Sequence, residues 1–261
     1  MGIISEIFTI LENVCFGNFY FKIALMLRQG LLINSVLHNS SVWYNVTQKD
    51  IKDLSQLDQI FFSRLLKLPK TAPAEAVFLE TGTLDFETNI KMSRILYFHN
   101  LVNRPQNQIL YAFFMKQYSK PTQGDWICQV LDDMKEFDIS CSFDYMKSMS
   151  KLSFKTIVKK RAIEFAFRKY RKSKLLHSKM HNLKYDELKI QDYFTDENLS
   201  NNEKITIMRW RILCEDFGEN YKGGRQSVLC PLCMGHKDGQ LESFTRCDFI
   251  THRIRFRGQY E

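Results

Sequence analysis

The segment from Thr47 to Leu68, TQKDIKDLSQLDQIFFSRLLKL, constrains the fold more than any other part of the chain. Thr47 is a favourable N-cap, and Asp50 three residues later completes an approximate capping box. Apolar residues then recur at helical spacing and form a single stripe: Ile51, Leu54, Leu57, Phe61 and Leu65. Pro69 and Pro73 end the pattern. The segment therefore predicts an amphipathic helix that packs against the rest of the protein.

Helical spacing of apolar residues extends over most of the 261 residues, so we expect a mainly α protein with a substantial core. Gly82 follows one helical segment, where glycine commonly ends a helix. Gly30 interrupts another segment at a cost of about 1 kcal/mol relative to alanine. Strand signals are weak, apart from a hairpin that residues 221–250 could form. The other expected helices are 3–14, 18–39, 73–81, 86–102, 107–118, 124–137, 142–174 with a break near 150, 185–194 and 202–214.

Positive charge is concentrated in one part of the chain. The whole protein carries a formal net charge of +8, whereas residues 151–184 contain 12 Lys/Arg and one acid, Glu164. This block therefore carries +11 and leaves −3 for the rest of the chain. A local block of this kind indicates a polyanionic partner more strongly than a uniformly high isoelectric point would.

The basic block predicts a helix with two different faces. Four apolar side chains cluster on one side: Phe154, Val158, Ala162 and Phe165. Four cations fall on an arc of roughly 100° elsewhere: Lys160, Arg161, Arg168 and Arg171. Two interpretations follow. The cations contact nucleic-acid phosphates, or they form a solvent face in which Glu164 pairs with Lys160 and Arg168, contributing about 0.2–0.5 kcal/mol a pair.

Cysteine usage and the N-terminus indicate an intracellular protein, cytoplasmic or nuclear. The seven cysteines are odd in number and four are isolated, so we expect free thiols and no disulfide framework. The N-terminal segment has no basic region and carries Glu6 and Glu12, which is unlike a secretory signal. The longest uncharged run, between Arg28 and Lys49, is too polar to span a bilayer. We therefore expect no membrane association.

A metal site is indicated by Cys230-Pro-Leu-Cys233, because two cysteines at this spacing can direct both thiolates to one zinc ion. Cys247 supplies a third ligand. His252, five residues later, gives Cys-x2-Cys-x13-Cys-x4-His, which is within the usual range for structural zinc. His236 would require a tight return of the loop. The remaining alternatives are a water ligand or a remnant that binds no metal.

Catalytic patterns are missing from the sequence. It has no Gly-rich phosphate loop, no Gly-x-Ser-x-Gly elbow and no His-Glu-x-x-His helix. Adjacent acids occur in LDDMKEFD, residues 131–138, where we expect a solvated helix face. His99, within ILYFHNL, is expected to be a core or boundary residue. We expect no small-molecule substrate.

Several weak motifs in a consistent order give the chain a family resemblance. Residues 31–69 resemble the thumb region of a LINE-type (non-LTR) retrotransposon reverse transcriptase, with Trp43, Thr47, Asp50, Leu54, Arg64, Leu65 and Leu66 at the matching places. VFLETG at 77–82 and MSRILYFHNLV at 92–102 resemble later motifs of that family. PTQGDWICQVLDDM at 121–134 resembles its Lys-Gly-Asp-Trp segment. The cysteine stretch at 230–247 resembles its terminal zinc knuckle, so the likeness spans nearly the whole chain.

The resemblance implies nucleic-acid handling without catalysis. The family polymerises DNA through palm carboxylates in a Tyr/Phe-x-Asp-Asp turn, which this sequence lacks, and its palm would precede Met1. Only 14 residues follow Cys247, too few for the endonuclease that some relatives carry there. The expected organisation is a thumb-like helical domain at 1–104, a helical region with the basic helix at 105–200, and a knuckle-like segment at 201–261. DENLSNNE, residues 196–203, is the best linker between the last two.

The expected function is binding of RNA or DNA through phosphate contacts. The candidate contacts are Lys155, Lys159, Lys160, Arg161, Arg168, Lys169, Arg171 and Lys172, with Arg64 and Arg94 suggested by the family. The candidate zinc ligands are Cys230, Cys233, Cys247 and His252, because Ser243 stands where the family knuckle has its histidine. The alternatives are a helical interaction scaffold with no nucleic-acid role and a functionless relic of a mobile element.

Overall fold

The computed structural model describes residues 2–13, 19–69, 72–176 and 185–212. The chain divides into two compact units, residues 1–201 and 202–261. The expectation of a mainly helical protein is confirmed. Within the described residues there is no β-strand, only an isolated antiparallel bridge between Thr81 and Ile190.

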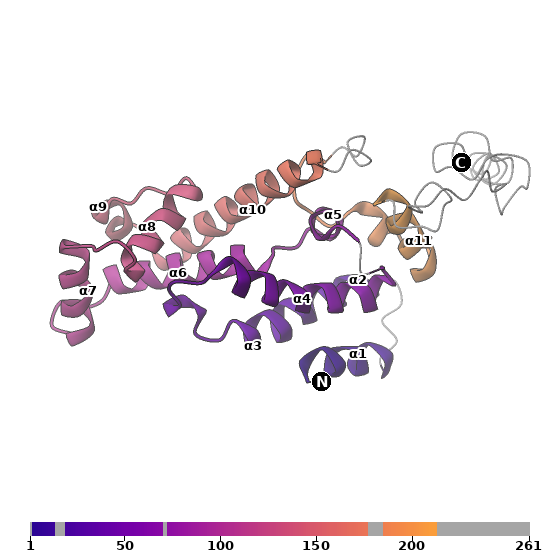
Figure 1. The fold of residues 1–261 in the computed structure, drawn as a ribbon, viewed down its shortest axis with the longest axis horizontal. Helices are drawn as coiled ribbons and strands as arrows, with labels where there is room; N and C mark the ends of the chain where they lie inside the picture. Colours follow the sequence, from indigo (N-terminus) through magenta and orange to yellow (C-terminus); the bar gives the residue numbers. More distant parts are fainter. Residues whose placement is uncertain (1, 14–18, 70–71, 177–184, 213–261) are drawn as a thin grey trace, which may run out of the picture. The chain divides into compact units, whose positions relative to one another are not determined.

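Figure 1 labels the helices in chain order. In chain order they are α1 (Ile3–Asn13), α2 (Tyr20–Leu27), the π-helical η2 (Arg28–Ile33), α3 (Asn34–Val36), the 3-10 turn η3 (Ser40–Val42), α4 (Gln48–Leu66), α5 (Ala74–Thr81), α6 (Phe86–Val102), α7 (Ile109–Ser119), α8 (Trp126–Glu136), α9 (Phe143–Ser148), α10 (Lys151–Leu176), the 3-10 turn η5 (Asp192–Phe194) and α11 (Asn201–Arg211).

Local chemistry sets several helix ends as the sequence predicts. At α4 the capping box is complete, because the Asp50 N–H donates to Thr47 Oγ1 at 3.2 Å and the Thr47 N–H donates to Asp50 Oδ2 at 2.9 Å. Gly82 ends α5 in the left-handed conformation with φ 65°. Ser150 accepts from the Ser153 N–H at 3.1 Å and marks the break between α9 and α10.

Two helix predictions need correction. Residues 18–39 contain one continuous helical stretch, Tyr20–Val36, whose middle is π-helical around Gly30. Residues 185–194 are not a helix apart from η5, because their backbone bonds to α5 instead. The Gln191 N–H donates to the Glu80 carbonyl at 3.0 Å, and Ile190 bridges to Thr81.

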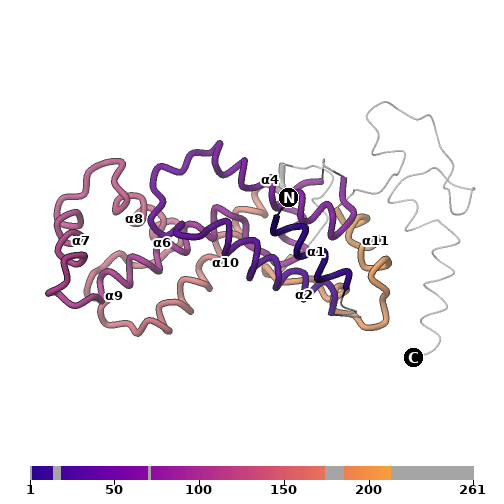
Figure 2. Tube along the Cα trace, turned by 90° about the horizontal axis from the view of Figure 1, so that it is seen from below, coloured from indigo at the N-terminus to yellow at the C-terminus, as the bar shows by residue number. Residues whose placement is uncertain are grey.

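Helix α6 lies at the centre of the first unit. It contacts α4, α7, α8, α9 and α10, together with η3. Figures 1 and 2 show α7, α8 and α9 at one end of α6 and α10, and α1, α2 and α5 toward the other end. This central position accounts for buried side chains on nearly every side of α6, including Phe86, Ile90, Ile95 and Phe98.

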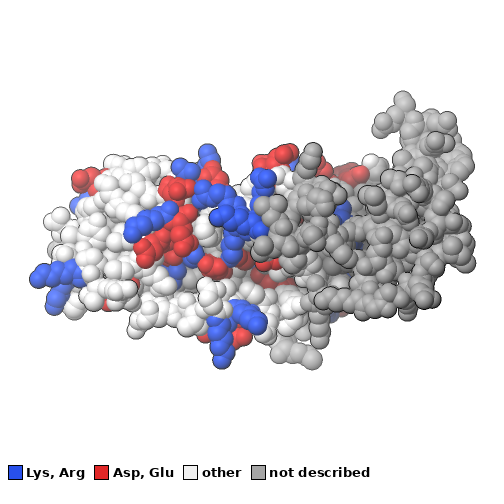
Figure 3. Space-filling view, turned by 45° about the horizontal axis from the view of Figure 1, so that its top comes forward, with Lys and Arg blue, Asp and Glu red and all other residues white. Residues whose placement is uncertain are grey.

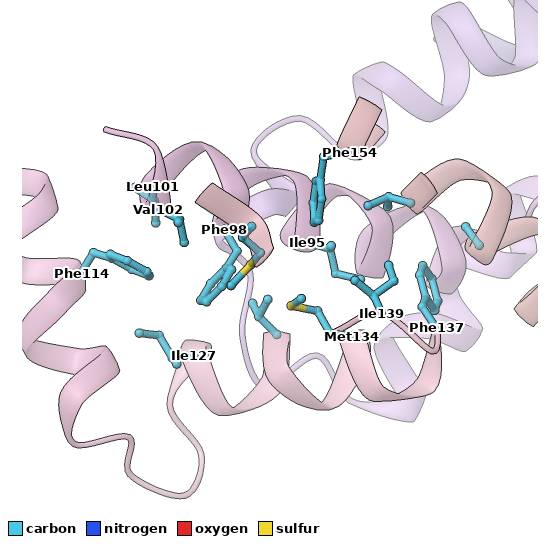
Figure 4. Close-up of a cluster of buried hydrophobic side chains, with 14 of the residues drawn as sticks. Ile95, Phe98, Leu101, Val102, Phe114, Ile127, Met134, Phe137, Ile139 and Phe154 are labelled. Carbon is cyan, nitrogen blue, oxygen red and sulfur yellow. The ribbon is translucent and has the colours of Figure 1, made fainter. Parts of the chain in front are cut away.

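The main hydrophobic core crosses the boundary that we expected after residue 104. Ile95 and Phe98 of α6 pack with Ile127 and Met134 of α8 and with Phe154 of α10 (Figure 4). These side chains are fully buried. Residues 1–104 and 105–200 therefore share one core rather than forming two domains.

Buried polar side chains are held by specific partners. The expectation that His99 is a core residue is confirmed, because its ring is buried and stacks on Phe154 with centroids 4.2 Å apart. Arg28 of η2 is buried and donates to Asp58 of α4 at 2.8 Å. Burial outweighs the neighbouring guanidinium and raises the pKa of Asp58 to about 6.

Residues 185–194 close over the end of α5. Tyr185 and Tyr193 both donate hydrogen bonds to the buried carboxylate of Glu80, the latter at 2.7 Å. A Cβ at Gly82 would collide with the backbone of Lys189 and Ile190. Gly82 is therefore required both by its positive φ and by this close approach.

Candidate nucleic-acid interface

Helix α10 is anchored by one row of side chains spaced four residues apart. The row is fully buried: Phe154, Val158, Ala162, Ala166 and Tyr170. It faces α6 and α5, the two helices that α10 contacts most. The predicted docking side is confirmed, with Phe165 half-buried against the same core. The buried row fixes which side chains of α10 point outward.

Two outward rows of α10 carry most of its cations. The first row comprises Lys155, Lys159, Ile163, Phe167 and Arg171. The second comprises Leu152, Thr156, Lys160, Glu164, Arg168 and Lys172. All are exposed except Phe167 and Glu164, which are partly buried.

Five cations in these rows have no acidic partner. In the part of the chain that the structure describes, no carboxylate lies within ion-pair distance of Lys155, Lys159, Lys160, Arg171 and Lys172, which we call the open cations. From Lys155 to Lys172 the helix rises about 25 Å. Arg171 lies over the ring of Phe167, with its guanidinium carbon 5.5 Å from the ring centroid. The open cations form two exposed groups, one from Lys155 to Lys160 and one at Arg171 and Lys172, about 16 Å apart along the helix.

Arg161 and Arg168 are partly neutralised. Arg161 donates to Glu164 on the same helix at 2.9 Å. Arg168 donates to Asp138, which lies just beyond the end of α8, at 2.9 Å. Glu164 therefore pairs with Arg161, three residues earlier on the helix. The sequence had suggested Lys160 and Arg168 as its partners. Both pairs are solvent-exposed, so each guanidinium can exchange its partner at little cost.

Lys169 is bound from two sides. Its Nζ lies 2.6 Å from Asp85 and 2.6 Å from Glu87, both near the start of α6. These carboxylates raise the pKa of Lys169 even though its burial acts in the opposite direction. Burial would raise the pKa of Glu87, but hydrogen bonds from Lys169 and Lys91 outweigh it and lower this pKa to about 2. Lys169 therefore ties α10 to α6 and is not available as a free cation.

Arg94 is a core residue. Only 3% of it is exposed, and its guanidinium donates to both oxygens of Asp133 at 2.8 and 3.0 Å. A third hydrogen bond, 3.3 Å long, reaches the Trp43 carbonyl. The family-suggested role of Arg94 as a surface contact is therefore wrong for this structure, because the side chain joins α6 to α8 inside the protein.

Arg64 lies on α4, apart from the α10 rows. It is exposed, lies over the ring of Phe8 at 4.3 Å and donates to Glu12 at 3.1 Å. These contacts join α4 to α1. Arg64 therefore lies on a different helix from the open cations and is not part of the α10 surface.

The sequence did not identify the acids that divide the cations into paired and open groups. Asp85 and Glu87 lie more than 80 positions before Lys169, and no local pattern links them to it. Within residues 131–138, Asp132 is exposed as expected, but Asp133 is buried against Arg94. The expectation of a solvated face was wrong for Asp133.

Figure 3 shows basic and acidic side chains intermixed over part of the described surface, rather than one continuous basic patch. Arg168, Lys169 and Lys91 each lie within ion-pair distance of an acid. The positive charge available to a partner is therefore smaller than the block of 12 Lys/Arg in the sequence suggests.

The predicted zinc ligands Cys230, Cys233, Cys247 and His252, with Ser243, lie outside the described residues. Among the residues that are described, no three His, Cys, Asp or Glu side chains are grouped so as to hold a metal ion. A search of the same residues finds no helix with the length and apolar character needed to cross a bilayer.

Comparison with known proteins gives no match among protein-family models, curated proteins or solved structures.

Proposed function

We propose that this chain is a non-catalytic part of a LINE-type reverse transcriptase that binds RNA or DNA through phosphate contacts. The observation that carries the proposal is the set of open cations on α10: Lys155, Lys159, Lys160, Arg171 and Lys172. A helix anchored by its opposite side and exposing unpaired cations over about 25 Å is suited to follow a phosphate backbone.

Phosphate contacts alone carry no sequence information, so we expect binding to tolerate any sequence. The release of counterions drives such binding and makes it depend strongly on salt. Arg161 and Arg168 can add contacts if phosphates displace Glu164 and Asp138 from their exposed pairs. Arg94 and Lys169 are left out of the contact set because both are held by carboxylates.

The motif resemblance extends the proposal beyond α10. In that family the thumb lies along a primer–template duplex, and a zinc knuckle follows a basic segment. We propose that Cys230, Cys233, Cys247 and His252 hold one zinc ion, with His252 in place of a histidine at Ser243. Zinc content of the wild type and of His252→Ala tests this part separately, since the variant should lose the metal.

Salt dependence of binding tests the phosphate contacts directly. We expect log K against log salt for a mixed-sequence duplex to have a slope of about −4.5 if all five open cations contact phosphates. Replacing Lys155, Lys159 and Lys160 with Gln should reduce the magnitude of the slope by about 3. Fluorescence anisotropy of a labelled oligonucleotide measures both quantities.

A matched triple variant supplies the control. Lys49, Lys116 and Lys120 are exposed lysines away from α10, and their replacement with Gln should leave the slope unchanged. A wild-type slope near zero would overturn the proposal and favour a helical scaffold without a nucleic-acid role. Equal losses in both triple variants would instead indicate diffuse attraction to net charge.

A further inference from the structure

The outward side of α10 carries an exposed apolar strip between its cations. The strip consists of Leu152, Ile163 and Phe167, of which Leu152 is 76% exposed and Ile163 40% exposed. At 100° per residue these three positions fall within an arc of roughly 60°. They are not part of the buried row that anchors the helix.

Cations precede and follow the two neighbouring apolar residues of this strip, Ile163 and Phe167, along the helix. Lys155 and Lys159 lie two turns and one turn before Ile163 in the same row, and Arg171 lies one turn after Phe167. Phe167 has a planar partner in Arg171, 5.5 Å away. The result is a short apolar and aromatic surface with open cations at both of its ends.

Contact with a duplex backbone does not require such a strip. Phosphates of a duplex face outward and its bases are stacked inside, so leucine, isoleucine and phenylalanine side chains gain nothing from phosphate contacts. Unstacked bases of a single strand can instead lie on apolar and aromatic side chains while cations bind the backbone. An arginine guanidinium can also stack on a base.

We propose that α10 binds single-stranded nucleic acid in preference to duplex, with bases resting on the apolar strip and phosphates on the flanking open cations. This inference rests on the proposed function, since it assigns a substrate class to the same face. Phe167 and Arg171 provide the stacking surface, and Ile163 covers an adjacent base. Leu152, about 16 Å nearer the start of the helix, covers a base farther along the strand.

A membrane surface is the competing partner for a basic helix with apolar residues. Helices that lie in a membrane interface bury a broad apolar face 5–10 Å deep. Here the apolar arc is only roughly 60° wide and has lysines at its edge, while the broader apolar face of α10 is already buried in the core. The narrow strip therefore favours bases over lipid.

Binding should be compared for four probes at one salt concentration: a mixed-sequence single strand, its duplex, an abasic strand of the same length, and vesicles containing phosphatidylserine. The wild type should bind the single strand more tightly than the duplex or the abasic strand. Replacing Leu152, Ile163 and Phe167 with Ala should weaken single-strand binding by about tenfold or more and change duplex binding by less than about twofold.

Phe113→Ala is the matched control, because Phe113 is a 62% exposed aromatic residue on α7. It should leave all affinities unchanged, and circular dichroism should confirm that each variant retains its helical structure. Equal affinity for single strand, duplex and abasic strand would overturn the inference while leaving backbone binding intact. If the variant with Ala at positions 152, 163 and 167 loses vesicle binding but keeps single-strand binding, the strip binds lipid. Absence of salt-dependent binding to any strand would instead defeat the proposed function itself.

Discussion

Helices α6 and α10 both carry basic residues, but they hold them in opposite ways. On α6, Lys91 contacts Glu87 at 2.7 Å and Glu136 at 2.6 Å, and Arg94 is buried against Asp133. On α10, five cations face outward with no carboxylate within ion-pair distance in the described part of the chain. The first helix uses its cations to join elements, and the second exposes them.

The difference shows that basic residue types do not by themselves identify an interface. Lys169 lies on α10 among the open cations but is held like a residue of α6, because Asp85 and Glu87 reach it from the start of that helix. The position of the acids decides which role a lysine or arginine has. The following predictions test this division.

The largest effect is expected at Arg94. Arg94→Ala should lower the free energy of unfolding by about 3–5 kcal/mol, because it leaves the Asp133 carboxylate buried without its partner. Lys155→Ala, on the open side of α10, should change it by less than about 0.5 kcal/mol. Urea unfolding measures both variants. If Arg94→Ala lowers the free energy of unfolding by less than about 1 kcal/mol, then cations that bind acids inside the protein do not differ in stability contribution from the open cations.

The second effect is a pH dependence at Glu87. Its pKa is lowered from 4.5 to about 2 in the folded protein, so the folded state favours the ionised form. The resulting stability is present above about pH 4.5 and is lost as the pH falls toward 2, by up to about 3 kcal/mol. Glu87→Gln should therefore show a weaker loss of stability than the wild type between these pH values, measured by urea unfolding at each pH. Glu164→Gln, at an exposed pair, should follow the wild-type profile.

A third comparison sets two lysines of α10 against each other. Lys160→Gln should reduce the magnitude of the salt slope for duplex binding by about 1 and leave stability nearly unchanged. Lys169→Gln should leave the slope nearly unchanged and lower stability, because it removes a partner from Asp85 and Glu87. Anisotropy titrations and urea unfolding of both variants separate the roles. The reverse pattern would mean that phosphates displace Asp85 and Glu87 from Lys169.

The smallest effect is expected at Glu164. Glu164→Gln releases Arg161 and removes the one acid from the outward rows of α10. The slope of log K against log salt for duplex binding should become more negative by up to about 1. The free energy of unfolding should fall by only about 0.2–0.5 kcal/mol. An unchanged slope would place Arg161 outside the contact surface.

Local features of the fold could be predicted from the sequence because the interactions that set them are local. The capping box of Thr47 and Asp50, the extent of α6 at 86–102 and the break near residue 150 all rest on neighbouring residues. Helical spacing also placed Phe154, Val158 and Ala162 on the buried side of α10, although the row continues through Ala166 and Tyr170, which were not predicted. These predictions are confirmed.

Long-range features could not be predicted in this way. Burial of Arg94 depends on a carboxylate 39 residues away, and Lys169 depends on acids 84 and 82 residues away. Residues 185–194 have helical spacing but bind the backbone of α5, so tertiary contacts override local preference. For the same reason the sequence overstated the candidate interface, in which ten predicted contacts include only five open cations.

The closure of residues 185–194 over α5 has a consequence for synthesis and folding. Glu80 and Gly82 meet Tyr185 and Ile190 across more than 100 residues of chain, which gives these contacts a high loop-closure cost. While a nascent chain is still being made, Glu80 has neither tyrosine hydroxyl until residues 185–193 leave the ribosome. Completion of the first unit therefore waits for nearly its last residues, and a chain that ended shortly before residue 185 would lack both tyrosine hydroxyls that bind Glu80.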